Sequence, residues 1–112
     1  MAVMDVRNSS SGWLTLWLEP LGEDRWLSPD ETLRVRSEYN GDEVAFFVDF
    51  SVSDDDRSAG IDNVTVWIER GSTYAEVTDL QGQAVECGHQ RPEEINDRWK
   101  SAAQEARRRA GE

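Results

Sequence analysis

Residues 12–20 read GWLTLWLEP, and their alternation predicts a β-strand that is apolar on both faces. Side chains point alternately to the two sides of a strand, so the three leucines of this stretch share one face. Trp13 and Trp17 then lie on the other face, and this face is in contact with water when the sheet packs on the core with one face only. The fold must therefore cover these two indoles or present them to another molecule.

Stretches of the same alternating kind recur along the chain, separated by the Gly, Pro, Asn, Asp and Ser residues that favour turns. Asn40 and Gly41 are a strong hairpin signal, which predicts that the strands on either side of them pair. Short strands at this spacing are typical of sandwiches, so we expect a mainly β fold, a small antiparallel β-sandwich of six or seven short strands, over residues 1–90. The expected strands span residues 13–19, 32–39, 43–52, 63–69 and 74–80, with shorter candidates at 4–8, 25–27 and 84–87.

The hydrophobic period changes near the C-terminus. Ile95, Trp99, Ala102 and Ala106 recur at spacings of four, three and four, which places them in one stripe along a helix over residues 92–110. We expect the segment 91–112 to form an amphipathic α-helix that belongs to the same domain and packs its stripe on a face of the sheet.

Large aromatic side chains occupy outward positions of several expected strands. By alternation, Trp13, Trp17, Phe47 and Trp67 all point away from the core, and they form one patch if their strands are neighbours. If the C-terminal helix covers this patch, it belongs to the core; left open, it is a binding surface for a partner. The opposite row of the strand at 43–52 is expected to face the core, namely Val44, Phe46, Val48, Phe50 and Val52.

The charge of the chain indicates which partners it can attract. It carries 23 acidic and 12 basic residues, a net charge of -11, so direct binding to nucleic acid or to an anionic membrane is not expected. A basic protein would be attracted over long range, and a second copy of the chain is the alternative partner. The acidic residues that we expect to contact a basic partner are Glu23, Asp24, Asp54, Asp55 and Asp56.

Residues suited to catalysis are few. His89 is the single histidine and Cys87 the single cysteine, and the two flank Gly88 as a nucleophile and its base could. No motif supplies the third, orienting group, and no phosphate-binding or dinucleotide-binding glycine pattern occurs. The sequence therefore predicts no enzyme, no catalytic residue and no cofactor.

One acidic segment, residues 53–62, partly matches a calcium-binding loop. Its alternate oxygen-bearing residues fit an EF-hand, but Ala59 stands where that loop needs glycine and Thr65 where it needs glutamate. We therefore expect no metal centre, with Asp54, Asp56 and Asp62 as weak candidates for a Ca²⁺ site.

These observations predict a non-enzymatic, acidic protein-interaction module, one version of which is an inhibitor or immunity-type protein that binds a basic partner. The alternative is a carbohydrate-binding β-sandwich with an aromatic platform and a weak Ca²⁺ site. The N-terminal residues lack the pattern of a signal peptide and a lone cysteine allows no internal disulfide, so we expect a cytoplasmic protein.

Overall fold

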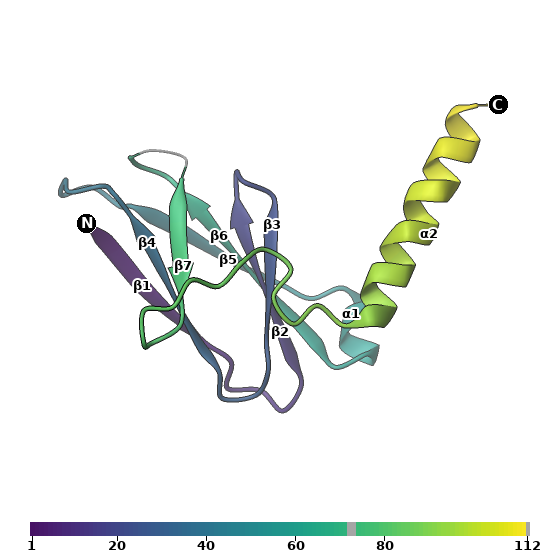
Figure 1. Ribbon diagram of the computed structural model, residues 1–112, viewed down its shortest axis with the longest axis horizontal. Helices are drawn as coiled ribbons and strands as arrows, with labels where there is room; N and C mark the ends of the chain where they lie inside the picture. The colour runs from purple at the N-terminus through teal and green to yellow at the C-terminus, as the bar shows by residue number, and fades with distance from the viewer. Residues whose placement is uncertain (72–73, 112) are drawn as a thin grey trace.

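The computed structural model describes residues 1–71 and 74–111 and confirms a mainly β fold with one C-terminal helix (Figure 1). Within these residues the strands are β1 (Ala2–Arg7), β2 (Trp13–Glu19), β3 (Glu23–Leu27), β4 (Thr32–Ser37), β5 (Phe46–Ser51), β6 (Ile61–Ile68) and β7 (Ala75–Thr78). A short helix, α1 (Asp54–Ser58), precedes β6, and the long helix α2 (Glu93–Ala110) ends the chain.

Two sheets form the two layers of the molecule. The smaller has the strand order β1-β4-β7 and the larger the order β3-β2-β6-β5. Rows of alternate side chains from both sheets meet in one core, and burying each leucine or valine contributes about 1.5–3 kcal/mol. The fully or almost fully buried members of this core include Leu16, Leu18, Leu27, Leu33, Val35 and Val66.

One strand pairing differs from the expected antiparallel arrangement. β2 and β6 are parallel, with Leu16 opposite Val64, whereas the other pairings within the two sheets are antiparallel. Side chains alternate in the same way in both arrangements, so the sequence pattern does not distinguish them. The two parallel strands start side by side, where Trp13 N donates to Gly60 O at 3.1 Å.

The prediction of a hairpin at Asn40 and Gly41 is wrong, because the strands before and after these residues do not pair with each other. β4 lies in the smaller sheet and β5 in the larger one, so the chain between them crosses from one layer to the other. A local contact holds this crossing, because Glu43 N donates to the hydroxyl of Tyr39 at 3.1 Å. The turn signal marks a reversal of the chain, but the strands on its two sides complete different sheets.

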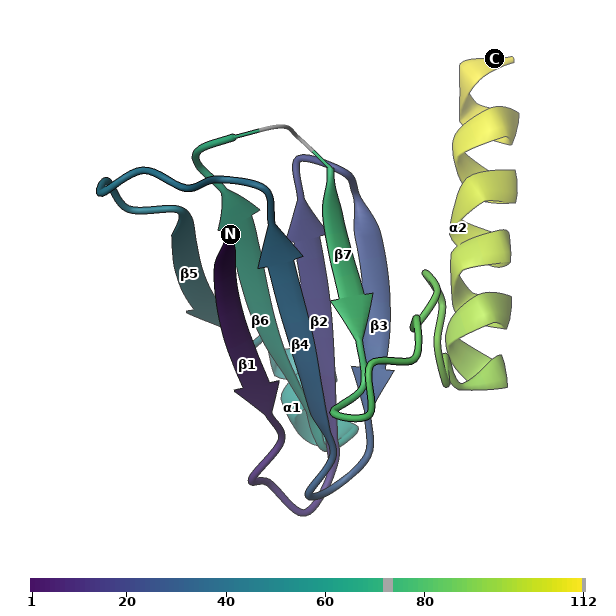
Figure 2. The same ribbon diagram turned by 60° about the vertical axis from the view of Figure 1, so that its left-hand side comes forward.

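In the described part of the chain, helix α2 contacts the sandwich only near its start. Ile95 is 4% exposed and Trp99 is half-buried, whereas Ala102 and Ala106 of the predicted stripe are exposed. Figures 1 and 2 show the helix beside the sandwich, and in Figure 1 it extends away from the strands toward its C-terminal end. Among the described residues, no helix has both the length and the apolar character needed to cross a bilayer.

Candidate functional site

The outer face of the larger sheet, which points away from the smaller sheet, has one half covered by α2. Trp26 and Ile61 form an apolar cluster there with Ile95, and Trp13 and Trp99 pack against it. The Trp13 and Trp26 rings meet edge to face with centroids 6.3 Å apart. Trp26 is the residue that sequence reasoning missed, because its strand is too short to show a clear alternation.

The second outward tryptophan of β2 is also covered. Trp17 lies 5.8 Å from Trp99 between ring centroids, and the Arg91 guanidinium stands 4.8 Å from the centroid of Trp99. Both contacts are favourable for aromatic rings. Trp13 and Trp17 therefore belong to the interface between the sheet and its own helix, and the structure removes them from the open patch.

The other half of the outer face is open. Phe47 on β5 and Trp67 on β6 are directly opposite each other in the strand register, and they are 54% and 41% exposed. These two predicted partner-binding residues are thus neighbours, on the side of the sheet away from β3 and its covering helix. The single patch expected from alternation is split into a covered part and an open part.

The row of β5 that was expected to face the core is largely exposed. Phe46 packs against the core, but Val48 is 48% exposed, Phe50 64% and Val44 71%. The smaller sheet has three strands against four, and Figure 2 shows β5 at the rim of the larger sheet, beyond β1. Among the described residues, Val44, Val48 and Phe50 are not part of the buried core, and so their predicted burial is wrong.

Apolar side chains therefore cover both faces of one edge strand. We call Phe47, Val48, Phe50 and Trp67 together the β5 rim. Within β5 itself Asp49 is the only charged residue. An edge strand with so little charge is unusual, because exposed sheet edges are normally protected by charges, by proline or by a covering segment.

The backbone of β5 is also open along its outer edge. Glu69 N donates to Ala45 O at 2.9 Å, in register with the pairing of β5 and β6. Hydrogen-bonded residues alternate along an antiparallel pair, so Phe47 and Asp49 turn their N–H and C=O groups toward β6. The N–H and C=O groups of Phe46, Val48 and Phe50 point the other way, and no described residue forms a backbone hydrogen bond with them across that edge.

The opposite edge of the same sheet is closed by residues 84–91. Gly88 N donates to Asp24 O at 2.6 Å, and Trp26 N donates to His89 O at 2.9 Å. The Gln90 side chain donates to Trp26 O at 2.9 Å. This covering segment pairs with the Asp24 C=O and with both backbone groups of Trp26, so the β5 edge is the open end of the larger sheet.

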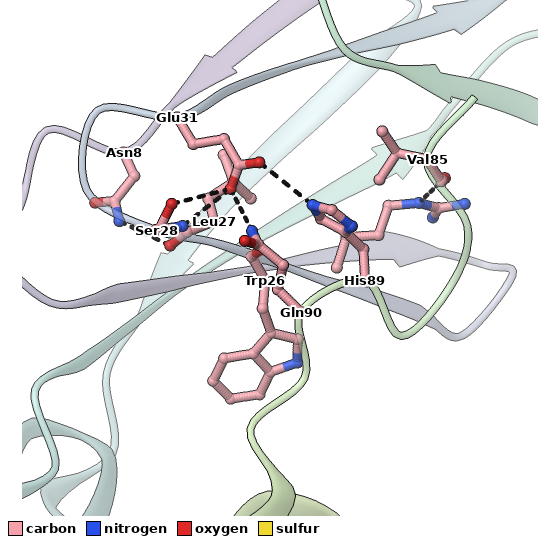
Figure 3. A network of polar contacts seen from close by, with 9 residues as sticks. Asn8, Trp26, Leu27, Ser28, Glu31, Val85, His89 and Gln90 are labelled. Carbon is pink, nitrogen blue, oxygen red and sulfur yellow. Dashed lines mark hydrogen bonds and ion pairs between the residues drawn. The ribbon is translucent and has the colours of Figure 1, made fainter. Parts of the chain in front are cut away.

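Glu31 fastens this covering segment. Its carboxylate accepts hydrogen bonds from Ser28 N at 3.0 Å and from the Gln90 side chain at 2.6 Å, and it lies 3.3 Å from Nε2 of His89 (Figure 3). His89 thus holds the covering segment in place beside β3. Cys87 turns to a different carboxylate, because its Sγ lies 3.6 Å from Oδ1 of Asp24.

Asp24 was expected to contact a partner, but it is only 3% exposed. Burial raises the pKa of its carboxyl, and hydrogen bonds from Arg91 and Trp26 outweigh this effect, so that its pKa lies below the ordinary value. Glu23 is half-buried and forms an ion pair at 3.0 Å with the buried Arg25. Asp24 is therefore a structural group, which is a correction to the predicted contact set.

The acidic segment after β5 forms the helix α1 instead of a metal loop. Ser53 caps this helix by accepting from Asp56 N, and Asp54 and Asp55 lie exposed in its first turn. Asp56 accepts from the Asn63 side chain at 2.8 Å and lies 3.7 Å from Arg98 of α2. Among residues 1–71 and 74–111, no three His, Cys, Asp or Glu side chains are grouped to hold a metal ion, so Asp54, Asp56 and Asp62 are not brought together as one site.

A cavity of about 240 Å³ lies where α2 meets the start of β6. Trp13, Ile61 and Ile95 line it with apolar surface, and Arg98 lines it with charge. Pockets that enclose a small-molecule ligand are usually larger, about 300–1,000 Å³.

Comparisons with protein-family models, with curated proteins and with solved structures find no match to this chain.

Proposed function

We propose that this chain is a non-enzymatic protein-interaction module that binds a basic partner protein through the β5 rim. The observation that carries the proposal is the exposure of large apolar side chains on both faces of one edge strand, with Phe47 54% and Phe50 64% exposed. Contiguous apolar surface of this kind marks a binding site on soluble proteins. Aromatic anchors also contribute most of the free energy of many interfaces.

The charge of the chain supports a basic partner. The net charge is -11, and the exposed residues Asp54 and Asp55 follow the β5 rim directly in the chain. Such charges attract a basic protein over long range and raise its association rate, an effect that falls with ionic strength. An inhibitor or immunity-type protein would use this surface against the basic active site of a nuclease or toxin.

The proposed setting is the cytoplasm. Cys87 is a free, exposed thiol and the chain contains no second cysteine, which suits a reducing compartment.

The test is a comparison of two surface variants in an extract of the native host. The double variant Phe47→Ser and Phe50→Ser removes both aromatic anchors of β5, whereas Leu80→Ser removes an apolar side chain that is 50% exposed elsewhere. We expect the unchanged chain and Leu80→Ser to retain a basic protein that salt elutes, and the double variant to bind it at least about tenfold more weakly. Recovery of no basic partner, or equal retention by all three chains, would contradict the proposal.

A second candidate, a carbohydrate-binding sandwich, is favoured by one observation. Phe47 and Trp67 lie side by side and exposed on one sheet face, as in an aromatic platform for sugar rings. Titration with soluble polysaccharides, with and without Ca²⁺, distinguishes the two functions through the emission of Trp67. Saturable quenching that Trp67→Ala abolishes would favour the carbohydrate-binding function over the protein-interaction module.

A further inference from the structure

We propose that the partner adds a β-strand to the open edge of β5, and that this strand is an extended segment of a basic protein, apolar in its middle and with Lys or Arg at both ends. This inference rests on the proposed function and specifies how the β5 rim is bound. Three features carry it: the free backbone groups of β5, the side chains on its two faces, and the charges at its two ends.

The backbone of β5 is arranged to accept another strand. Phe46, Val48 and Phe50 point their N–H and C=O groups away from β6. This follows from the 2.9 Å hydrogen bond between Glu69 N and Ala45 O, because the backbone groups of successive residues in an antiparallel strand point alternately toward and away from the neighbouring strand. A strand laid about 4.8 Å away would pair with all of these groups. Addition of an extended segment to a free sheet edge is a recurring mode of peptide recognition.

The side chains of the β5 rim favour strand addition over docking on one face. Phe47 and Trp67 lie on the outer face of the sheet, whereas Val48 and Phe50 lie on the inner one. A partner that covered only the outer face would leave the inner pair in water. An added strand projects side chains to both faces in turn, so a single segment covers both pairs.

The charges at the ends of β5 identify the occupant as a basic segment. Asp42 and Glu43 precede the strand, and Asp54 and Asp55 follow it, all of them exposed. Glu43 is already paired with Arg70 at 2.6 Å, and the other three have no ion pair among the described residues.

A second copy of the chain fits this surface less well. Two β5 strands paired antiparallel would bring the acidic start of one against the acidic end of the other, and each copy carries a charge of -11. Like charges placed opposite each other disfavour such a pairing. Lys or Arg at both ends of a partner segment would instead meet acidic groups at both ends of β5.

The test uses the synthetic peptide KKVTVTVKK and amide hydrogen exchange of the full chain, followed by NMR. In the free protein we expect the amides of Val48 and Phe50 to exchange quickly and those of Phe47 and Asp49 to exchange slowly, because only the latter face β6. Added peptide should slow exchange at Val48 and Phe50 at least about tenfold. The same peptide with alternate amides N-methylated, and the acidic peptide EEVTVTVEE, should leave both amides unprotected.

A pair of variants gives an independent readout. Val48→Pro removes the outward N–H and leaves the bonds to β6 in place, because proline is tolerated where an edge N–H faces solvent. Val48→Thr is the matched control, since it keeps the N–H and the branched shape. We expect Val48→Pro to weaken binding of KKVTVTVKK at least about tenfold and Val48→Thr to change it less than about threefold.

The following outcomes would overturn the proposal that the partner adds a strand to β5. Protection of Val48 and Phe50 that rises with protein concentration alone would identify a second copy as the occupant. Absence of peptide binding, or binding without protection of these amides, would also refute it. If the double variant at Phe47 and Phe50 still loses the basic partner from the host extract, the interaction module stands and only its mode of binding is wrong.

Discussion

Replacement of Ile95 by alanine tests how α2 is held on the sheet. Ile95 is 4% exposed and packs with Trp26 and Ile61, and truncating a buried isoleucine to alanine costs about 2–5 kcal/mol. The exposed residues Ala59 and Glu94 line the adjoining cavity of about 240 Å³, so water can reach the space that the substitution creates. We therefore expect a loss in the lower part of that range, about 2–3 kcal/mol of unfolding free energy.

Urea unfolding followed by tryptophan emission and far-UV circular dichroism measures this loss. Most of the stability of a helix in a protein comes from the packing of its apolar face, so α2 should lose helicity when it detaches. The emission of Trp13, Trp17 and Trp99 should shift to the red together with that loss, because detachment exposes all three.

The matched control is Ala102→Ser on the same helix. Ala102 belongs to the stripe predicted from the sequence but is exposed in the structure, so we expect only the loss of helix propensity, about 0.5 kcal/mol. A loss below about 0.5 kcal/mol for Ile95→Ala, or equal losses for the two variants, would refute the view that only the first turns of α2 hold the sheet.

Three further predictions concern Thr15 and Asp24, which are buried in the larger sheet, and Gly12, which is half-buried just before β2. Thr15 is fully buried and its Oγ1 has no hydrogen-bond partner among the described residues, so Thr15→Val should raise the unfolding free energy measured in urea by about 1 kcal/mol. A Cβ at Gly12 would collide with the carbonyl oxygen of Gly60, so Gly12→Ala should lower the unfolding free energy by about 1–3 kcal/mol and not raise it. The folded state holds the pKa of Asp24 below its unfolded value of about 3.9. The stability that this carboxylate contributes is therefore fully present above about pH 3.9 and is lost as the pH falls through the folded pKa. Urea titrations from about pH 6 down to about pH 2 should therefore show that the unfolding free energy falls less steeply with pH in Asp24→Asn than in the unchanged chain. The same dependence of unfolding free energy on pH in both chains would contradict this role of Asp24.

Local patterns in the sequence predicted the strands and much of the core. The leucines of β2 occupy the inner face as their alternation requires, and Leu14, Leu16 and Leu18 are all buried. The spacing of Ile95, Trp99, Ala102 and Ala106 likewise predicted the helix, but only Ile95 and Trp99 of this stripe are covered by the sheet. These predictions succeed because periodicity is a property of the chain near each residue.

Burial on β5 could not be predicted in the same way. Val48 and Phe50 alternate as core residues do, but their burial depends on whether the opposite sheet extends above them. The strand order that decides this is set by contacts between distant segments, as in the parallel pairing of β2 with β6. Trp26 was missed because its strand of five residues is too short to show a clear alternation, and its partners Ile61 and Ile95 are also remote in the chain.

The way in which the chain alternates between the two sheets has a consequence during synthesis on the ribosome. β2 lies in the middle of its sheet and needs β6 as a neighbour, and β4 needs β7. The larger sheet cannot be completed until β6, which ends at Ile68, has left the exit tunnel, and the smaller sheet must wait for β7, which ends at Thr78. The leucines of β2 therefore stay exposed until most of the chain has been synthesised. We expect the incomplete nascent chain to bind chaperones, because exposed apolar segments are prone to aggregate.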